Sequence, residues 1–298
     1  MNGVDFLKVI KNKLINIDQT DFQIHFENSN LIKGKGSPLL KWAGGKRLLL
    51  KDILPIVPTN FNKFYEPFLG GGALFFSLKP NYSILSDNNC ELINCYIQVR
   101  DHAEQVITSL NTFNNSEDDY YRIRNKVLTD KVAQAARFIY LTTLSFNGIH
   151  RVNLKGEFNV PYGHRTHLKP CNESKIRSAS ETLTHSKLHC MDFQESVSDA
   201  QEGDLIYFDP PYTVAHNNNG FIKYNSKIFS WNDQIRLSEL AKSLVNRGCK
   251  VIISNANHPS ILELYEGFYC QIVERTSLIA ASGKHRKNIS ECIFYKGV

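Results

Sequence analysis

The sequence predicts an α/β fold built around a doubly wound sheet. Two observations predict this fold. Short runs rich in β-branched and aromatic residues recur along the chain, and such runs are typical of strands buried in parallel sheets. Helical patterns separate these runs, as crossover connections between parallel strands require.

Two strands are predicted in the first third of the chain. The first spans residues 63–67, and a glycine turn from Gly70 to Gly72 follows it and opens a helix. The second is the run YSILSD, which ends at Asp87. A helical pattern continues from there to about Leu110.

Three more strands are predicted in the second half of the chain, at residues 187–193, 204–208 and 250–257. A helix precedes the last of them. It is marked by apolar residues at spacings of three and four, namely Leu237, Leu240, Ala241, Leu244 and Val245.

The domain organisation follows from where this alternation fails. Residues 112–180 are polar and rich in Asn, Arg, His and Lys, which predicts a second, smaller domain inserted between two strands. The main domain then comprises residues 37–111 and 181–298. Residues 1–36 have the composition of an N-terminal extension or loose linker.

Bulk properties indicate a globular protein with a basic balance. The 298 residues can bury a sizeable core, and the formal charge of +6 suits a polyanionic partner. No stretch approaches the roughly 18 apolar residues of a membrane span, and the start lacks the apolar region of an export signal. We therefore expect a cytoplasmic protein that does not bind membranes.

The seven cysteines are scattered and contain no CxxC pair or nearby histidine cluster with metal-ligand spacing. This pattern favours reduced thiols over a disulfide framework or a zinc site. We expect no bound metal.

The glycine turn lies between a strand and a helix, where its backbone N–H groups can approach a ligand. Asp87 ends the next strand, where a carboxylate can hold ribose hydroxyls. The arrangement fits a dinucleotide or another adenosine-containing cofactor, and a plain tight turn with a surface aspartate remains the alternative.

The run DPPY at residues 209–212 is more specific. Asp209 follows a strand at the edge where doubly wound sheets bind ligands, and the carbonyl of Pro210 is an acceptor beside it. Two acceptors suit a planar amino group, and Tyr212 offers a face on which the attached ring can stack. The alternative is a capped strand end with a buried turn tyrosine.

This chemistry indicates methyl transfer to an aromatic amine. Hydrogen bonds from both N–H groups would localise a lone pair that is otherwise delocalised into the ring. The methyl donor would be S-adenosylmethionine, and positioning in a dehydrated polar site would supply most of the acceleration. A base in a duplex reaches such a pocket only after it is flipped out.

Other motifs concern the partner. In the insert, Asn147, Arg151, Asn153 and Asn159 are base or phosphate readers in type, interleaved with aromatic residues, although a polar surface loop is equally compatible. The basic stretch SGKHRKN at residues 282–288 is either a solvated turn or a phosphate contact.

Five motifs occur in the order of a known family. They are KWAGGK at 41–46, EPFLGGG at 66–72, Asp87, FNGIHRVNLKGEFNVPYG at 146–163 and DPPY at 209–212. Together they resemble the DNA adenine methyltransferase (Dam) family, the D12 class of N6-adenine enzymes. The resemblance covers about residues 37–297. It implies a Rossmann-like methyltransferase sheet that uses S-adenosylmethionine, with an inserted, mainly helical target-recognition domain.

The resemblance implies three sets of site residues. The catalytic positions are Asp209, Pro210, Pro211 and Tyr212. The positions around S-adenosylmethionine are Trp42, Lys46, Glu66, Phe68, Gly70, Gly71, Gly72, Asp87, Asp192, Phe193 and Asp209. The positions that match DNA contacts are Lys41, Phe146, Asn147, Ile149, Arg151 and Pro161.

The expected partner is double-stranded DNA. Family members commonly methylate GATC, and Arg151 beside FNVP favours that site. Ile149, His150 and His164 depart from the residues expected there, which leaves related, longer sites open. Restriction-associated relatives also leave open a cognate restriction endonuclease that acts separately.

Alternatives from other classes are weaker. Methylation of RNA or of a protein glutamine is less compatible with Asp209 and the insert, and a nicotinamide dehydrogenase leaves DPPY unexplained. A DNA-binding module without catalysis conflicts with an intact DPPY run beside an intact glycine turn.

Overall fold

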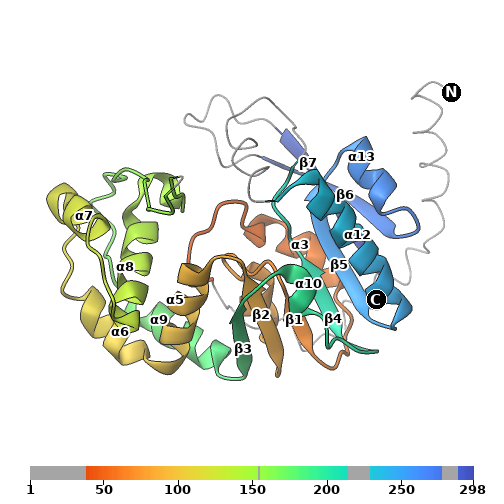
Figure 1. Cartoon of the computed structure of the whole chain (residues 1–298), viewed down its shortest axis with the longest axis horizontal. Helices are drawn as coiled ribbons and strands as arrows, with labels where there is room; N and C mark the ends of the chain where they lie inside the picture. Colours follow the sequence, from red (N-terminus) through yellow and green to blue (C-terminus); the bar gives the residue numbers. More distant parts are fainter. Residues whose placement is uncertain (1–37, 154, 214–228, 277–287) are drawn as a thin grey trace. The chain divides into compact units, whose positions relative to one another are not determined.

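The computed structural model describes residues 38–153, 155–213, 229–276 and 288–298. These residues contain a seven-stranded sheet with the order β3-β2-β1-β4-β5-β7-β6 (Figure 1). Strands β1 to β5 are parallel, whereas β7 runs antiparallel to both β5 and β6. The strands are Phe64–Glu66 (β1), Ser83–Asp87 (β2), Ser186–Cys190 (β3), Leu205–Phe208 (β4), Lys250–Ala256 (β5), Tyr269–Thr276 (β6) and Asn288–Lys296 (β7).

The helices follow the predicted alternation. The α-helices are Leu50–Ile53 (α3), Ala73–Leu78 (α4), Cys90–Asp101 (α5), Ala103–Leu110 (α6), Glu117–Arg124 (α7), Lys131–Leu144 (α8), Glu173–Leu183 (α9), Phe193–Ser196 (α10), Trp231–Asn246 (α12) and Pro259–Leu264 (α13). The described part of the chain also contains the 3₁₀ helices Lys46–Leu48 (η1), Leu54–Ile56 (η2) and Phe146–Gly148 (η3). Side chains of Asn89, Ser116, Asp130, Asn172 and Ser230 accept hydrogen bonds from first-turn amides and so define helix starts.

Both faces of the sheet are covered, as the doubly wound prediction requires. Along β4, Leu205 and Tyr207 belong to one hydrophobic cluster, and Ile206 and Phe208 belong to the other. Because side chains alternate across a strand, the two clusters lie on opposite faces. The predicted α/β fold class is therefore confirmed.

Strand boundaries differ from the prediction in informative places. The strand predicted at residues 187–193 ends at Cys190, because the Asp192 carboxylate accepts a hydrogen bond from the Gln194 amide and starts α10. Strands β6 and β7 were not predicted from the sequence. Both are antiparallel strands at the end of the sheet, outside the parallel crossover pattern that identified the others.

The sheet has its topological switch point between β1 and β4. From β1 the chain proceeds outward through β2 and β3, whereas β4 pairs on the other side of β1 and leads to β5. Loops that leave two such strands at their carboxyl ends separate and form a crevice. The glycine turn follows β1 and the DPPY run follows β4, so both border this crevice.

The insert is mainly helical in its described residues and contains α7, α8 and a loop from Ser145 to Gly163. The α9 helix returns the chain to the sheet, and residue 180 lies within it. Arg177 on α9 pairs with Glu104 on α6, and the Ser180 hydroxyl donates to the carbonyl of Arg100 on α5. The α9 helix is thus fastened to α5 and α6 by polar contacts.

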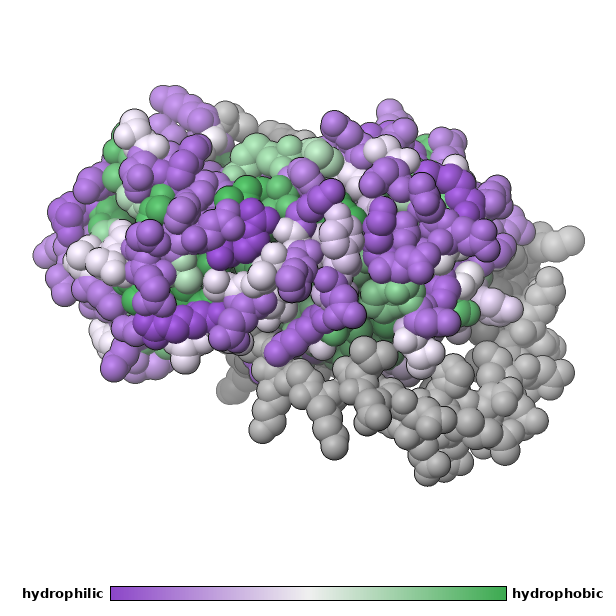
Figure 2. All heavy atoms as spheres, turned by 90° about the horizontal axis from the view of Figure 1, so that it is seen from below, coloured by the Kyte–Doolittle hydropathy of each residue, from purple (hydrophilic) through white to green (hydrophobic). Residues whose placement is uncertain are grey.

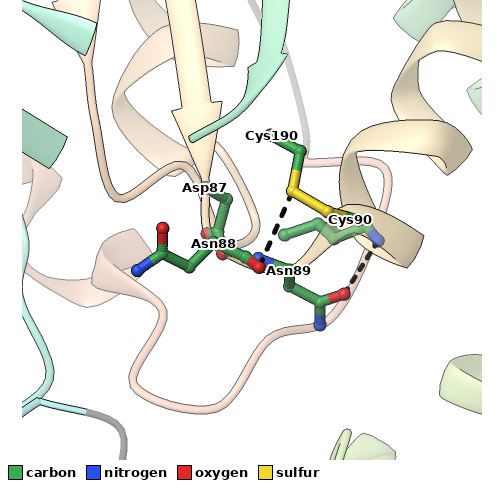
Figure 3. Close-up of a disulfide and its surroundings, with 6 residues drawn as sticks. Asp87, Asn88, Asn89, Cys90 and Cys190 are labelled. Carbon is green, nitrogen blue, oxygen red and sulfur yellow. Dashed lines mark hydrogen bonds between the residues drawn. A yellow bond between two sulfur atoms is a disulfide. The ribbon is translucent and has the colours of Figure 1, made fainter. Parts of the chain in front are cut away.

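One expectation about the cysteines is wrong. The structure places a disulfide between Cys90 and Cys190, which are 100 residues apart in the sequence (Figure 3). Strands β2 and β3 are neighbours, and Asp87 pairs with Cys190 in their register. Cys90 follows Asp87 by three residues, so the pairing of the strands brings the two sulfur atoms together.

Within the described ranges, no helix has the length and apolar character to cross a membrane, and the face in Figure 2 presents mostly hydrophilic residues. In the same ranges no cluster of three metal-ligating side chains could hold an ion. Residues 282–287 of the basic stretch lie outside the described residues.

Candidate active site

Asp209 emerges from the carboxyl end of β4 and meets a lysine from the start of the main domain. The Lys46 ammonium lies 2.8 Å from an Asp209 carboxylate oxygen, and the two side chains are 5% and 19% exposed. The same ammonium donates to the Gly44 carbonyl and lies 4.7 Å from the centroid of the Tyr212 ring. Acid, cation and aromatic face therefore converge at one point.

Two further side chains hold the DPPY run from outside. The Tyr212 hydroxyl donates to Glu291 on β7 at 2.7 Å, and the Gln234 amide on α12 donates to the Pro211 carbonyl at 3.3 Å. Burial, reinforced by the negative charges of Glu291 and Asp209, raises the pKa of Tyr212 well above its ordinary value. Its phenol therefore remains a protonated donor at neutral pH.

The glycine turn after β1 has the left-handed backbone that favours glycine at two positions, with φ of 45° at Gly70 and 64° at Gly72. A Cβ atom at Gly70 would lie 2.7 Å from the Trp42 indole, so the turn and the indole require this close approach. The Gly70 amide donates to Asp87 at 3.0 Å, and the Tyr96 hydroxyl donates to the Gly70 carbonyl.

Two carboxyl groups, a buried one and a half-buried one, lie on either side of this turn. Glu66 ends β1 and accepts a hydrogen bond from the Phe75 amide in α4 at 3.1 Å. Burial raises the pKa of Glu66 well above its ordinary value, and the charge of Asp209 adds to this effect. Burial also raises the pKa of Asp87, although amide hydrogen bonds from Gly70 and Asn89 oppose it.

The third predicted acid follows β3. Arg236 on α12 binds the Asp192 carboxylate with two hydrogen bonds, at 2.7 and 2.9 Å. Its guanidinium also lies 4.2 Å from the ring centroid of the buried Phe193. The ring of Phe68, in the turn after β1, stacks on Phe193 at 5.3 Å, which links the ends of β1 and β3.

The predicted DNA contacts occupy the loop after α8 and the segment before η1. Phe146 is 46% exposed, and Asn147 is exposed with a left-handed φ of 56°. A Cβ atom at Gly148 would lie 2.7 Å from the Lys41 side chain, so Lys41 packs on this loop. The Phe146 amide donates to the Pro161 carbonyl, which brings the two ends of the loop together.

The other residues predicted to contact DNA differ in their exposure and in their hydrogen bonds within the protein. Arg151 is exposed, and its Nε donates to Asn159 at 2.8 Å. Ile149 is half-buried. The Asn153 amide binds Glu157, and its oxygen accepts from two amides of the 153–157 turn. The side chain of Asn153 therefore stabilises this turn.

Comparison with known proteins gives the family. Residues 42–279 match the family model described as D12 class N6 adenine-specific DNA methyltransferase. The chain belongs to this family.

Its relatives have matching names. The chain is 40% identical over 266 residues to the Type II methyltransferase M1.LlaDCHI of Lactococcus lactis subsp. cremoris, a match that covers 86% of this chain and 94% of that protein. It is 35% identical over 275 residues to the Type II methyltransferase M.MjaIII of Methanocaldococcus jannaschii, covering 84% and 95%. Identity to the DNA adenine methylase of Escherichia coli (strain K12) is 31% over 266 residues, covering 87% and 95%.

This DNA adenine methyltransferase keeps its predicted residues in two groups. The first lies at the carboxyl ends of the parallel strands and includes the glycine turn, Asp87 and the DPPY run. The second lies on the loop after α8. His150 on that loop stacks on Trp42 at 5.2 Å between ring centroids, which connects the groups.

Sequence reasoning missed three polar residues in the first group, namely Gln234, Arg236 and Glu291. Gln234 and Arg236 lie on a helix that was predicted from its apolar positions alone. Glu291 lies on β7, which was not identified. The available signal was a charged residue directly before the run CIFY at residues 292–295.

Proposed function

We propose that this DNA adenine methyltransferase takes its methyl group from S-adenosylmethionine and transfers it to the exocyclic amine of an adenine flipped out of duplex DNA. The target sequence is GATC or a related site. One observation carries the proposal: the Lys46 ammonium contacts the Asp209 carboxylate and the face of Tyr212 together.

The ammonium indicates what this place can bind. It presents N–H donors to the carboxylate while it lies over the aromatic ring. The adenine amine also has two N–H donors, and it is attached to a flat ring that can stack on tyrosine. We infer that the amine replaces the ammonium at Asp209 when the base enters.

Asp209 and the Pro210 carbonyl then act on the amine as acceptors. Hydrogen bonds to both N–H groups localise the nitrogen lone pair and favour a tetrahedral nitrogen. When bound, S-adenosylmethionine supplies a methyl group on a sulfonium, whose bond to sulfur breaks as the bond to nitrogen forms. The nitrogen becomes acidic only as it is alkylated, so Asp209 holds the departing proton without being a strong base.

The residues at the strand ends suit an adenosine-containing cofactor. The left-handed glycines shape the turn after β1 at the carboxyl edge of the sheet, and carboxylates follow both β2 and β3. Asp87 suits ribose hydroxyls, while Asp192 with Phe193 suits an adenine ring and its amine. Trp42, Glu66 and Phe68 line the turn between them.

The loop after α8 suits DNA. Phe146 and Asn147 are exposed at its tip and suit insertion into the base stack beside the flipped adenine. Arg151 suits a guanine edge. Further DNA contacts are proposed at Lys41, Ile149, Asn153 and Pro161. We also propose that the protein is cytoplasmic and that a cognate restriction endonuclease, if there is one, acts separately.

The test supplies S-adenosylmethionine with a labelled methyl group to the protein and duplex DNA, followed by digestion to nucleosides. Label is expected in N6-methyladenine. Mapping of methylated adenines in a genome that expresses the chain then gives the site. Label in RNA, in protein or in cytosine contradicts the proposal, and methylation confined to an unrelated motif contradicts only the GATC part.

A further inference from the structure

The catalytic tyrosine is held from a strand that the family model does not reach. Glu291 lies on β7, beyond the matched residues 42–279, and accepts a hydrogen bond from the Tyr212 hydroxyl at 2.7 Å. It is fully buried, and its backbone pairs with Ala256 of β5 on one side and Val273 of β6 on the other. The acceptor is therefore fixed by strands on both sides.

Burying the Glu291 carboxyl group costs free energy, and packing of the core does not require a carboxyl group at this position. A carboxyl group inside a protein loses its hydration and needs hydrogen bonds in return. The following residues of β7, Cys292, Ile293 and Phe294, are buried and apolar. An apolar residue at position 291 would suit this core, whereas a carboxylate suits a partner that donates from the DPPY run.

The contact with Glu291 is made at the hydroxyl end of the Tyr212 side chain and not at the face of its ring. Glu291 binds the hydroxyl at the far end of the Tyr212 side chain, while the Lys46 ammonium lies over the ring itself, 4.7 Å from its centroid. With backbone at one end and Glu291 at the other, the ring plane is set before any base arrives. Preorganised geometry of this kind lowers the barrier to a positioned reaction.

We propose that Glu291 is a positioning residue that sets the plane of the Tyr212 ring, against which the target adenine stacks during methyl transfer. This inference rests on the proposed function. Glu291 acts through Tyr212 and has no contact with the reacting atoms in this assignment.

The test compares kcat, KM and thermal stability for four variants. Tyr212→Phe keeps the ring and removes only the hydroxyl, so it tests the hydrogen bond even if changes at position 291 prevent folding. It is expected to lower kcat by roughly tenfold to a hundredfold, with KM for S-adenosylmethionine within about threefold of wild type. Glu291→Leu is expected to give the same pattern.

The kcat of the double variant Tyr212→Phe/Glu291→Leu is expected to be no more than about threefold below that of the worse single variant. Both single changes remove the same hydrogen bond, so their effects should not multiply. Glu291→Gln keeps an acceptor oxygen and is expected to retain more than about a third of wild-type kcat. A spectroscopic readout is 2-aminopurine in place of the target adenine. Its fluorescence depends on stacking, so saturated complexes of wild type and Glu291→Leu are expected to differ.

Asp204→Asn is the matched control for the loss of a buried carboxylate. Asp204 is 1% exposed and accepts hydrogen bonds from the amides of Lys63 and Gln201, away from the DPPY run. Asp204→Asn is expected to change the thermal stability. Its kcat and its 2-aminopurine emission should remain those of wild type. Wild-type kcat in Tyr212→Phe, or multiplied losses in the double variant, would overturn the inference. A wild-type protein that labels no DNA would instead contradict the proposed function.

Discussion

The loop that follows β4 lies among buried charged groups of other elements, whereas the loop that follows α8 has an exposed tip. Lys46 is 5% exposed beside Asp209, and Glu291 is fully buried. On the other loop, Arg151 is exposed and Phe146 is 46% exposed.

The anchors of the two loops differ accordingly. The DPPY run is held through the side chains of Asp209 and Tyr212 and through the Pro211 carbonyl. The loop after α8 is held through other residues: Tyr162 donates to the Asn115 side chain, and Tyr120 donates to the Val160 carbonyl. We expect substitutions in the first loop to affect transfer at every DNA sequence. Substitutions at the tip of the second loop should affect the choice of sequence.

The largest effect is expected from Asp209→Ala. It removes the acceptor for the target amine, so kcat should fall by about 10²–10⁴-fold at every site, while binding of S-adenosylmethionine largely survives. Single-turnover transfer and equilibrium binding of the labelled cofactor measure the two quantities. Equal loss of transfer and cofactor binding would show that Asp209 serves the cofactor instead of the amine.

Arg151→Ala tests the effect of the loop after α8 on the choice of DNA sequence. It should relax discrimination at one base pair of the site by about 1–3 kcal/mol and leave transfer to the preferred site much less affected. Ratios of kcat/KM for duplexes that differ at single base pairs provide the measurement. Arg177→Ala, which removes an exposed arginine on α9, is the control and should leave these ratios unchanged.

Glu66→Gln tests the buried charge through pH. The pKa of Glu66 is raised by burial, so its contribution to stability is fully present below its ordinary pKa of 4.5 and is lost as pH rises through the folded value. The Tm of wild type relative to Glu66→Gln should therefore fall as pH rises above the ordinary pKa of 4.5. A pH-independent difference would contradict the burial argument.

The smallest effect is expected from Tyr162→Phe. Loss of its hydrogen bond to Asn115 should cost about 1 kcal/mol, or roughly 2–4 °C in Tm, and loosen the loop after α8. Calorimetry measures the stability, and the single-base-pair ratios measure the loosening. Lower kcat at all sites with unchanged Tm would place Tyr162 with the first loop.

The parallel part of the fold could be predicted because its signals are local. Turns or helical patterns separate the apolar runs of β1, β2, β4 and β5 from one another. The predicted boundaries of these strands therefore fall within one residue of the observed ones, as for 250–257 against Lys250–Ala256. The antiparallel strands β6 and β7 give no crossover pattern. They were therefore not identified.

The site could be predicted where a motif carried the chemistry and not where tertiary contacts carried it. Asp209 and Tyr212 stand out in the sequence, but their partners Lys46 and Glu291 lie far along the chain in either direction. The disulfide between Cys90 and Cys190 has the same origin, because it depends on the pairing of β2 with β3. Spacing within one sequence cannot reveal such pairs.

If the loop after α8 selects the DNA sequence, as we propose, helix α9 determines where chimaeras between relatives can be joined. Since α9 spans Glu173–Leu183 and is fastened to α5 and α6, a chimaera cut at residue 180 would divide a helix and break its polar contacts with the sheet domain. Fusion points placed in the coil before Glu173 would exchange the loop after α8 and leave the contacts of α9 with α5 and α6 intact.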